Sequence, residues 1–146
     1  MNCCIKHIIT LLFVLNLFGL AVFSQTLEIR ILNLKRSGGQ LCVALFNSED
    51  NFKEENPCWN KIFPKDKITD EFSLVIPLKT GEYGLTVLDD VNMDKKMNYT
   101  LIGFPKEGFG FGGYKHKGIF KPHFDNFKFK IEEGQNLKID VDMKYY

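Results

Sequence analysis

The sequence contains few of the spacings that mark an enzyme or a zinc protein. Its four cysteines include no C-x-x-C pair and no Cys/His spacing typical of zinc ligands. None of its serines lies in a Gly-x-Ser-x-Gly nucleophile elbow. Low-complexity segments and long charged tails are also missing, so disorder is not expected. The chain therefore reads as a folded domain without a recognisable catalytic signature.

The N-terminal segment predicts export. Lys6 precedes an apolar run over residues 8–23 that only three residues interrupt, and the small residue Ser24 follows it. An uncleaved membrane anchor is the alternative, but the run is shorter than the roughly 20 residues that a spanning helix needs. We expect residues 1–24 to be a signal peptide and the protein to be periplasmic or extracellular. Membrane contact is then expected only through this peptide during export.

The expected exported chain has almost no net charge. The sequence has 19 basic and 18 acidic residues, and Lys6 is the only charged residue before Gln25. Balanced charge argues against a nucleic-acid partner and against an anionic membrane held by bulk electrostatics. The length of residues 25–146 suits a single domain with a core of its own.

Apolar residues in this domain follow the period-2 alternation of β-strands, and no helical period competes. The segments that we expect to form strands are 26–31, 40–46, 72–76, 83–88, 124–131 and 137–145. Segment 40–46 is apolar on both faces. Six or seven short strands separated by turns indicate an all-β sandwich.

The connections between these strands are of two kinds. A turn at residues 37–39 predicts that the first two strands form a hairpin. Residues 47–67 lack alternation and predict a long surface connection with at most a short helical turn. Residues 89–123 are rich in Gly, Asp, Asn and aromatic residues and form the most unusual region of the sequence.

Two segments resemble the bacterial family called domain of unknown function 2141. Residues 81–94 read GEYGLTVLDDVNMD, and residues 103–111 read GFPKEGFGF. The resemblance extends over nearly all of residues 25–146. It implies an exported, antiparallel, immunoglobulin-like or transthyretin-like β-sandwich of about seven strands, without an assigned activity. The chain departs from the family pattern at Asp89, Lys95 and Asn98, where His, Gly and Asp are usual.

The loop that begins at Asp89, the acidic loop, has some of the spacing of a Ca²⁺ loop. Candidate ligands are Asp90, Asn92, Asp94, Asn98 and Glu107. Lys95 replaces the usual turn glycine, and Leu101 stands where a bidentate Glu should close the site. Two interpretations therefore remain: a weak Ca²⁺ site, or a loop shaped only by the turn chemistry of Asp and Asn. No other cofactor is expected.

A glycine-flanked aromatic segment follows the acidic loop. Its aromatic residues are Phe104, Phe109, Phe111 and Tyr114. They could cover the open end of the sandwich as packing, or form a platform for a carbohydrate or a peptide. Gly108, Gly110 and Gly113 match G-x-G-x-x-G, but neither the preceding strand nor the following helix of a dinucleotide site is expected here.

The remaining reactive side chains lack a chemical context. Cys42 and Cys58 could form a disulfide in an oxidising compartment, or could be two unrelated thiols. His116 and His123 have no nucleophile at a telling spacing and are expected to be structural or solvated. We therefore expect a non-catalytic binding or structural module of unknown ligand. The alternatives are a Ca²⁺-stabilised carbohydrate- or peptide-binding domain and, third, a hydrolase.

Overall fold

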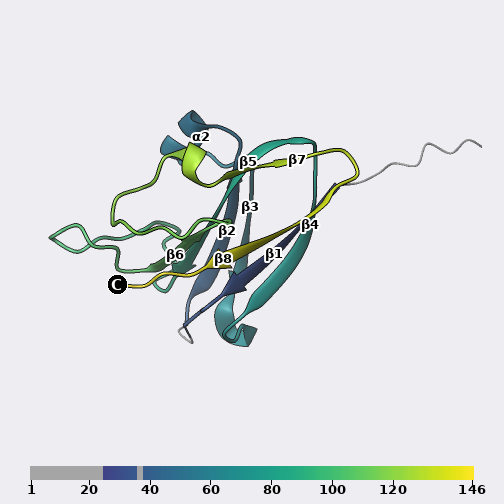
Figure 1. Cartoon of the computed structure of the whole chain (residues 1–146). Helices are drawn as coiled ribbons and strands as arrows, with labels where there is room; N and C mark the ends of the chain where they lie inside the picture. The colour runs from purple at the N-terminus through teal and green to yellow at the C-terminus, as the bar shows by residue number, and fades with distance from the viewer. Residues whose placement is uncertain (1–24, 36–37) are drawn as a thin grey trace, which may run out of the picture.

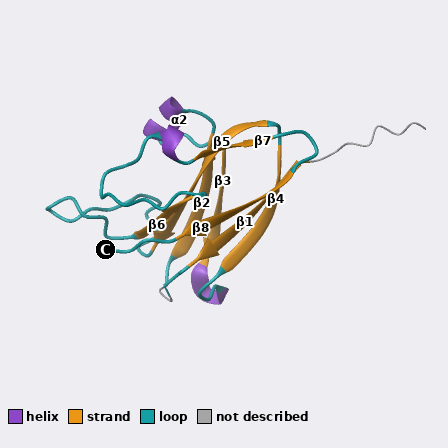
Figure 2. Cartoon of the chain, viewed as in Figure 1, coloured by secondary structure: helices purple, strands orange, loops and turns teal. Residues whose placement is uncertain are grey.

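Two β-sheets face each other in the computed structural model, which describes residues 25–35 and 38–146 (Figures 1 and 2). In the smaller sheet β1 (Gln25–Leu32) lies between β4 (Phe72–Leu78) and β8 (Asn136–Asp142). The β1–β4 pair is antiparallel, whereas the β1–β8 pair is parallel. The predicted β-sandwich is confirmed, with the correction that this sheet is mixed. The predicted signal peptide lies outside the described residues.

The larger sheet contains the strands that carry the candidate site. Its order is β3 (Trp59–Pro64), β2 (Gln40–Phe46), β5 (Gly81–Asp90) and β6 (Gly108–Phe111), and all of these pairs are antiparallel. The short strand β7 (Lys128–Ile131) pairs with the first residues of β5, and β6 pairs with its last residues. Thus β6 and β7 lie end to end along the same edge of β5.

The predicted hairpin between the first two strands is wrong. The strands β1 and β2 belong to different sheets, and their buried residues belong to one shared core. Each strand has a strongly apolar face, and burying both faces requires the strands to pack across the sandwich rather than edge to edge. Part of the expected turn, Ser37, lies outside the described residues.

Two other segments differ from expectation. Residues 47–67 contain the helix α2 (Glu49–Lys53), the edge strand β3 and the 3₁₀ turn η1 (Lys65–Lys67). In β3 most residues are exposed, so backbone pairing with β2 holds it without an alternating pattern. The strand predicted at residues 124–131 begins instead with the 3₁₀ turn η2 (Phe124–Asn126).

The main core lies between the two sheets. It is built from aliphatic residues at alternate positions of β1, β2, β5 and β8, with Ile76 from β4. The fully buried members are Leu27, Ile29, Ile31, Leu41, Val43, Leu45, Leu85 and Val141. The strands that the structure describes lie within residues 25–146 and contribute most of the buried residues of this core.

A second apolar cluster lies on the outer face of the larger sheet, next to α2 and η2. Its buried members are Phe46, Phe52, Phe109, Phe111, Phe124 and Phe127. Phe52 is the central ring, with centroids 5.3 Å from Phe46 and 4.9 Å from Phe127. The larger sheet is therefore apolar on both faces, as predicted for residues 40–46. Within the described residues, no helix is long and apolar enough to cross a membrane.

Candidate functional site

A cavity of about 480 Å³ lies on the outer face of the larger sheet. Its floor consists of the outward-facing residues of four strands, because side chains alternate between the two faces of a strand. In β2, Leu41, Val43 and Leu45 belong to the main core, so Cys42 and Ala44 face the cavity. The other floor residues are Phe46, Ile62, Thr86, Leu88, Phe109 and Phe111.

Three segments form the walls of this cavity. Helix α2 contributes Phe52, the acidic loop contributes residues 95–97 and Tyr99, and residues 119–122 complete the lining. The lining is predominantly aromatic and aliphatic, but it includes the exposed Lys95, Lys96 and Lys121. The Lys121 ammonium donates to the Phe52 carbonyl at 2.7 Å and lies 4.3 Å from the centre of the Phe52 ring. The cavity therefore combines an apolar floor with positive charge.

His116 places a polar atom in the cavity wall. Its ring lies 5.6 Å from that of Phe111, and its buried Nδ1 atom has no hydrogen-bond partner. Burial, and then the nearby Lys144 ammonium, lower the pKa of His116, so the ring is neutral at pH 7. The unpaired Nδ1 is buried from solvent, so it faces the protein interior rather than the open space of the cavity.

The four predicted platform residues do not act as one surface. Phe109 and Phe111 form part of the cavity floor, whereas Tyr114 lines a smaller hollow of about 150 Å³ beside it. Phe104, which precedes the other three in the sequence, contacts Tyr146 at a centroid distance of 5.7 Å. The structure thus contains both of the roles that the sequence left open, packing and cavity lining, and divides them among different residues.

The acidic loop brings three carboxylates together. One oxygen from each of Asp90, Asp94 and Glu107 lies within 4.8 Å of the others. Asp90 and Glu107 are buried, whereas Asp94 is exposed. Burial raises the pKa of Glu107, and repulsion from Asp90 and Asp94 adds to this. The charged form of Glu107, at the end of the loop, is therefore disfavoured by its surroundings.

The two asparagines of the loop do not complete a Ca²⁺ site. Their amide nitrogens donate to Asp94 Oδ2, from Asn92 at 3.1 Å and from Asn98 at 3.0 Å. The Asp90 carboxylate already accepts hydrogen bonds from the Lys95 backbone at 2.8 Å and from the Gln40 side chain at 2.7 Å. Since Ca²⁺ takes about 6–8 oxygen ligands, three carboxylates and two donating amides fit the ion poorly.

Lys95 adopts a conformation that suits glycine. Its φ angle is 64°, in the left-handed region that costs other residues about 1 kcal/mol or more. Its backbone N–H nevertheless bonds to Asp90, which holds the turn in place. This explains the departure noted in the sequence: a turn that favours glycine is kept here with a lysine, and the lysine side chain lines the cavity.

The comparison with protein families decides which family this is. A family model described as "Uncharacterized protein conserved in bacteria (DUF2141)" matches residues 29–140. The chain belongs to the DUF2141 family. The comparisons with curated proteins and with solved structures gave no match.

The glycines of the DUF2141 segment 103–111 have a steric role here. A Cβ atom at Gly108 would lie 2.1 Å from the Tyr145 ring, and one at Gly110 would lie 2.5 Å from Val141. Strand β6 can therefore approach β8 only with glycine at these positions. The alternate residues, Phe109 and Phe111, point the other way into the cavity. Packing thus accounts for the first two glycines of the G-x-G-x-x-G spacing, and a positive φ angle of 65° accounts for Gly113.

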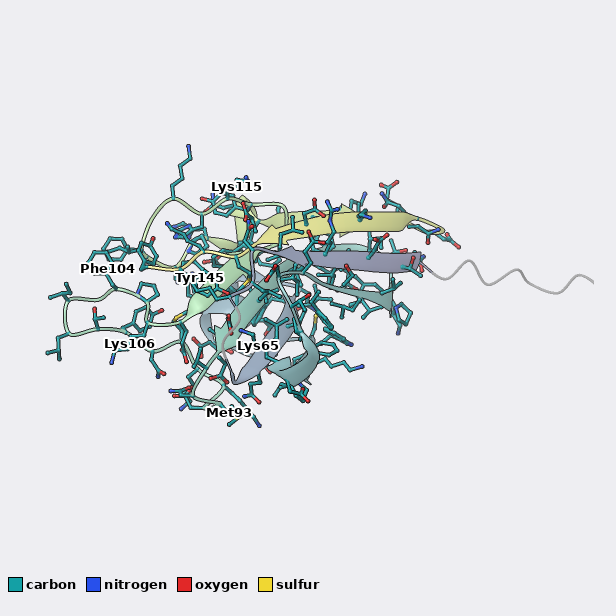
Figure 3. The ribbon with its side chains drawn as sticks, turned by 90° about the horizontal axis from the view of Figure 1, so that it is seen from below. Lys65, Met93, Phe104, Lys106, Lys115 and Tyr145 are labelled. Atoms are coloured by element: carbon teal, nitrogen blue, oxygen red, sulfur yellow. The ribbon has the colours of Figure 1, made fainter. Side chains whose placement is uncertain are left out.

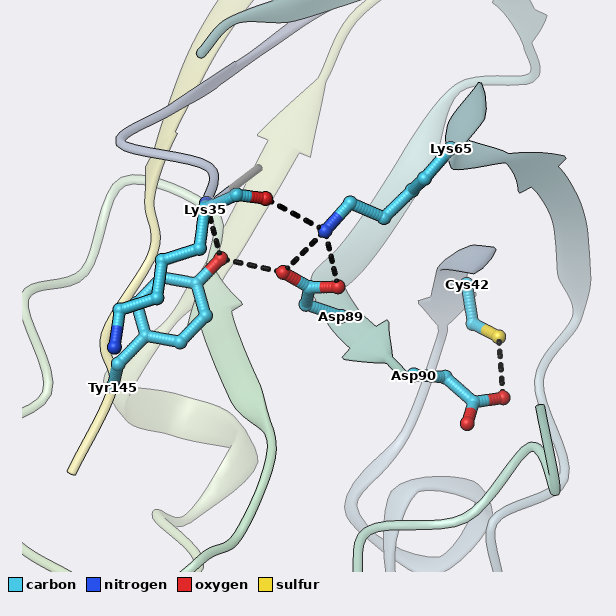
Figure 4. Close-up of polar contacts among 6 residues, drawn as sticks. All are labelled: Lys35, Cys42, Lys65, Asp89, Asp90 and Tyr145. Atoms are coloured by element: carbon cyan, nitrogen blue, oxygen red, sulfur yellow. Dashed lines mark hydrogen bonds and ion pairs between the residues drawn. The ribbon is translucent and has the colours of Figure 1, made fainter. Parts of the chain in front are cut away.

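The adjacent residues Asp89 and Asp90 point to opposite faces of β5 (Figure 4). Asp90 faces the acidic loop and accepts from the Cys42 thiol at 3.8 Å. Asp89 faces the interior, where the Lys65 ammonium bonds both of its oxygens at 2.7 and 2.8 Å. The Tyr145 hydroxyl donates to the same carboxylate at 2.6 Å.

Sequence reasoning missed this buried cluster. Lys65 and Asp89 are both almost fully buried, and they come from η1 and β5. The Lys65 ammonium also donates to the Lys35 carbonyl at 2.9 Å. The available signal was an acidic residue, Asp89, at the end of an apolar strand. Its partners lie 24 and 56 positions away, which no local pattern reveals.

Of the two alternatives for Cys42 and Cys58, a disulfide or unrelated thiols, the structure shows the second. Cys42 and Cys58 are free thiols in this DUF2141 protein. Cys42 pairs across the sheet with Ile62, four positions after Cys58, which corresponds to about 13 Å along a strand. A disulfide requires Cα atoms closer than about 7 Å. The Cys58 thiol instead donates to the Leu45 carbonyl at 3.3 Å.

The histidines are placed apart from any nucleophile. His123 is exposed, and its Nδ1 lies 3.5 Å from a Glu49 oxygen. Ser48 Oγ accepts from the Asn51 backbone and caps helix α2. Among the residues that the structure describes, no serine or cysteine side chain bonds to His116 or His123.

Proposed function

We propose that the protein is an exported, non-catalytic binding module that holds a small, largely apolar ligand on the outer face of its larger sheet. The observation that carries this proposal is the second apolar face. A sandwich needs only its inner faces to be apolar, yet here the outer face forms the floor of a cavity of about 480 Å³. Small-molecule sites span about 300–1,000 Å³.

The lining supports an amphipathic ligand with an anionic group. Apolar residues such as Ala44, Leu88 and Phe109 suit a hydrocarbon chain or an aromatic ring. Lys95 and Lys96 can neutralise an anionic group. Export is part of the proposal and is supported by the N-terminal apolar run. The immunoglobulin-like class is supported by the facing sheets.

The cavity is tested with a fluorescent probe and a variant that fills it. The probe is anilinonaphthalene sulfonate, which joins aromatic rings to an anionic group, and the protein is the span 25–146. We expect saturable binding of one probe molecule and displacement by dodecanoate. Ala44→Trp should weaken both by at least about tenfold, because the indole would occupy the cavity. Ser73→Trp places the same ring on the exposed outer face of β4 and should change neither.

The charge requirement is tested separately. Replacing Lys95 and Lys96 by Gln should weaken dodecanoate binding by about tenfold and leave dodecanol binding unchanged, since only dodecanoate is charged. Equal probe binding by wild type and Ala44→Trp would refute the cavity. Equal loss of dodecanoate and dodecanol in the lysine variant would refute the anionic group.

The second candidate is a Ca²⁺-stabilised carbohydrate- or peptide-binding domain. Its supporting observation is the convergence of Asp90, Asp94 and Glu107 within 4.8 Å. A bound cation would relieve the repulsion among these carboxylates and stiffen the loop that forms one wall of the cavity. It predicts a large thermal stabilisation by Ca²⁺, whereas the first candidate predicts almost none.

A further inference from the structure

The end of the molecule next to the cavity carries most of its unbalanced positive charge. Residues 95–123 include six lysines and a single acidic residue, Glu107, which is buried. The remainder of residues 25–146 has 12 basic and 17 acidic residues. The near-zero total thus conceals a strongly basic end, which the overall charge of the sequence did not predict.

Several of these lysines lack a carboxylate partner. Lys115 pairs with Asp142 at 3.1 Å, and Lys121 lies 3.7 Å from Glu55. The other four are Lys95, Lys96, Lys106 and Lys117, which form no ion pair within the described part of the chain. Their charges are therefore available to an anionic partner.

A hairpin at this end exposes large apolar side chains. It spans residues 98–106, closed by the Lys106 N–H to Asn98 oxygen bond at 2.9 Å and the Thr100 N–H to Phe104 oxygen bond at 2.8 Å. At its tip Leu101 is fully exposed, and Ile102 is 78% exposed. Figure 3 shows that the hairpin projects from the sandwich, with Phe104 and Lys106 on it.

We propose that this end docks on an anionic phospholipid membrane, with Leu101 and Ile102 inserted below the headgroups. Apolar side chains flanked by lysines match the two layers of a membrane surface, in which hydrocarbon lies beneath negative charge. A protein partner would be expected to meet a broader, flatter apolar patch than this projecting tip. The inference stands apart from the cavity, although a docked molecule would hold the cavity beside lipid.

Docking is tested by cosedimentation of the span 25–146 with vesicles. Binding should be strong to phosphatidylcholine mixed with phosphatidylglycerol, weak to phosphatidylcholine alone, and should fall as salt rises. The double change Leu101→Ser and Ile102→Ser should lower the partition coefficient by at least about tenfold. The double change Lys96→Gln and Lys106→Gln should lower it by about fivefold per lysine and flatten its salt dependence.

Matched controls remove the same groups elsewhere. Val75 is 63% exposed on β4, and Lys79 lies in the turn at the opposite end of β5 from the acidic loop. Val75→Ser and Lys79→Gln should bind vesicles as the wild type does. In addition, lipids brominated in their acyl chains should quench the tryptophan fluorescence of the Leu101→Trp variant more strongly than that of the wild type. The single tryptophan of the wild type is Trp59 in β3.

Three results would overturn the proposal. They are failure to bind phosphatidylglycerol vesicles at low salt, unchanged binding by the tip variant, and tighter binding to polyglutamate than to the vesicles. The last result would assign the basic end to an acidic protein partner. None of them bears on probe binding in the cavity, which is measured without vesicles.

Discussion

The buried Lys65–Asp89 pair is the most consequential contact between two individual residues. Both side chains are within 1% of complete burial, and the carboxylate is bonded on both oxygens. A buried pair adds little stability relative to an apolar pair, but removing one partner leaves a charge without compensation. The cluster joins η1, β5 and the residues that follow β8, so it ties the two sheets together at one end.

Breaking that pair should be costly. We expect Lys65→Met and Asp89→Asn each to lower the free energy of unfolding by about 3–5 kcal/mol in urea denaturation. Arg30→Met is the control, because its ion pair with Asp140 is exposed and should contribute little. If Lys65→Met proved no more damaging than Arg30→Met, the buried pair would have no special role.

Glu107 should give stability a pH dependence of opposite sign to that of a salt-bridged acid. Burial, with repulsion from Asp90 and Asp94, raises the pKa of Glu107 above its ordinary value of 4.5. Between that value and the raised native pKa the folded state binds more protons, so stability is lost as pH rises. Glu107→Gln should flatten this decline in melting temperature. An unchanged pH profile in the variant would contradict the assignment.

The pairing of β2 with β3 determines the state of the two cysteines. Burial raises the pKa of Cys42 to about 11, and the adjacent Asp90 carboxylate adds to the effect. Cys58 is exposed on the approach to β3. In native protein a thiol dye should therefore label Cys58 well before Cys42, because the thiolate is the reactive form. Both should label after unfolding without reductant, and a disulfide-linked peptide in mass spectra would contradict this register.

The acidic loop between β5 and β6 should bind Ca²⁺ only weakly. Its asparagine amides donate toward Asp94, and Lys95 and Lys96 add positive charge, so we expect a dissociation constant on the order of 10⁻³ M or weaker. A ligand at its dissociation constant adds only about 0.4 kcal/mol. Melting curves with millimolar Ca²⁺ and with a chelator should nearly coincide.

The control for the loop is Asp94→Asn combined with Glu107→Gln, which removes two of the three converging carboxylates. A Ca²⁺-dependent rise of many degrees that disappears in this variant would favour the second candidate function. The same rise in both proteins would show that Ca²⁺ acts elsewhere.

The fold of the whole molecule limits where a chain cleaved during export could begin. Strand β1 starts at Gln25, lies between two other strands, and has its first buried residue at Leu27. We therefore expect the N-terminus of protein recovered from its host to lie at Gln25 or within a few residues of it. A mature chain that began after Arg30 would lose the centre of a sheet and should not fold. Mass spectrometry of the intact protein tests this, and a retained Met1 would contradict export.

Local patterns in the sequence were sufficient for the sandwich and most of its strands. Short apolar segments bounded by turns located β1, β2, β4, β5 and β8, and in β1 and β8 alternation marked the single face that enters the core. These patterns missed β3, whose residues are mostly exposed, and β6, whose sequence GFGF is glycine-rich. These strands form because neighbouring strands supply hydrogen-bond partners, and that information is not local.

For the candidate site, the sequence by itself determined the carboxylates of the loop and the aromatic residues Phe109 and Phe111. Spacing in the chain was enough to single them out. Only the tertiary structure decided that Asp89 turns away from Asp90 to meet Lys65, and that the outer face of the larger sheet encloses a cavity. Charge pairing and enclosure depend on groups that are distant in sequence and adjacent in space, so they arise only when the sheets have packed.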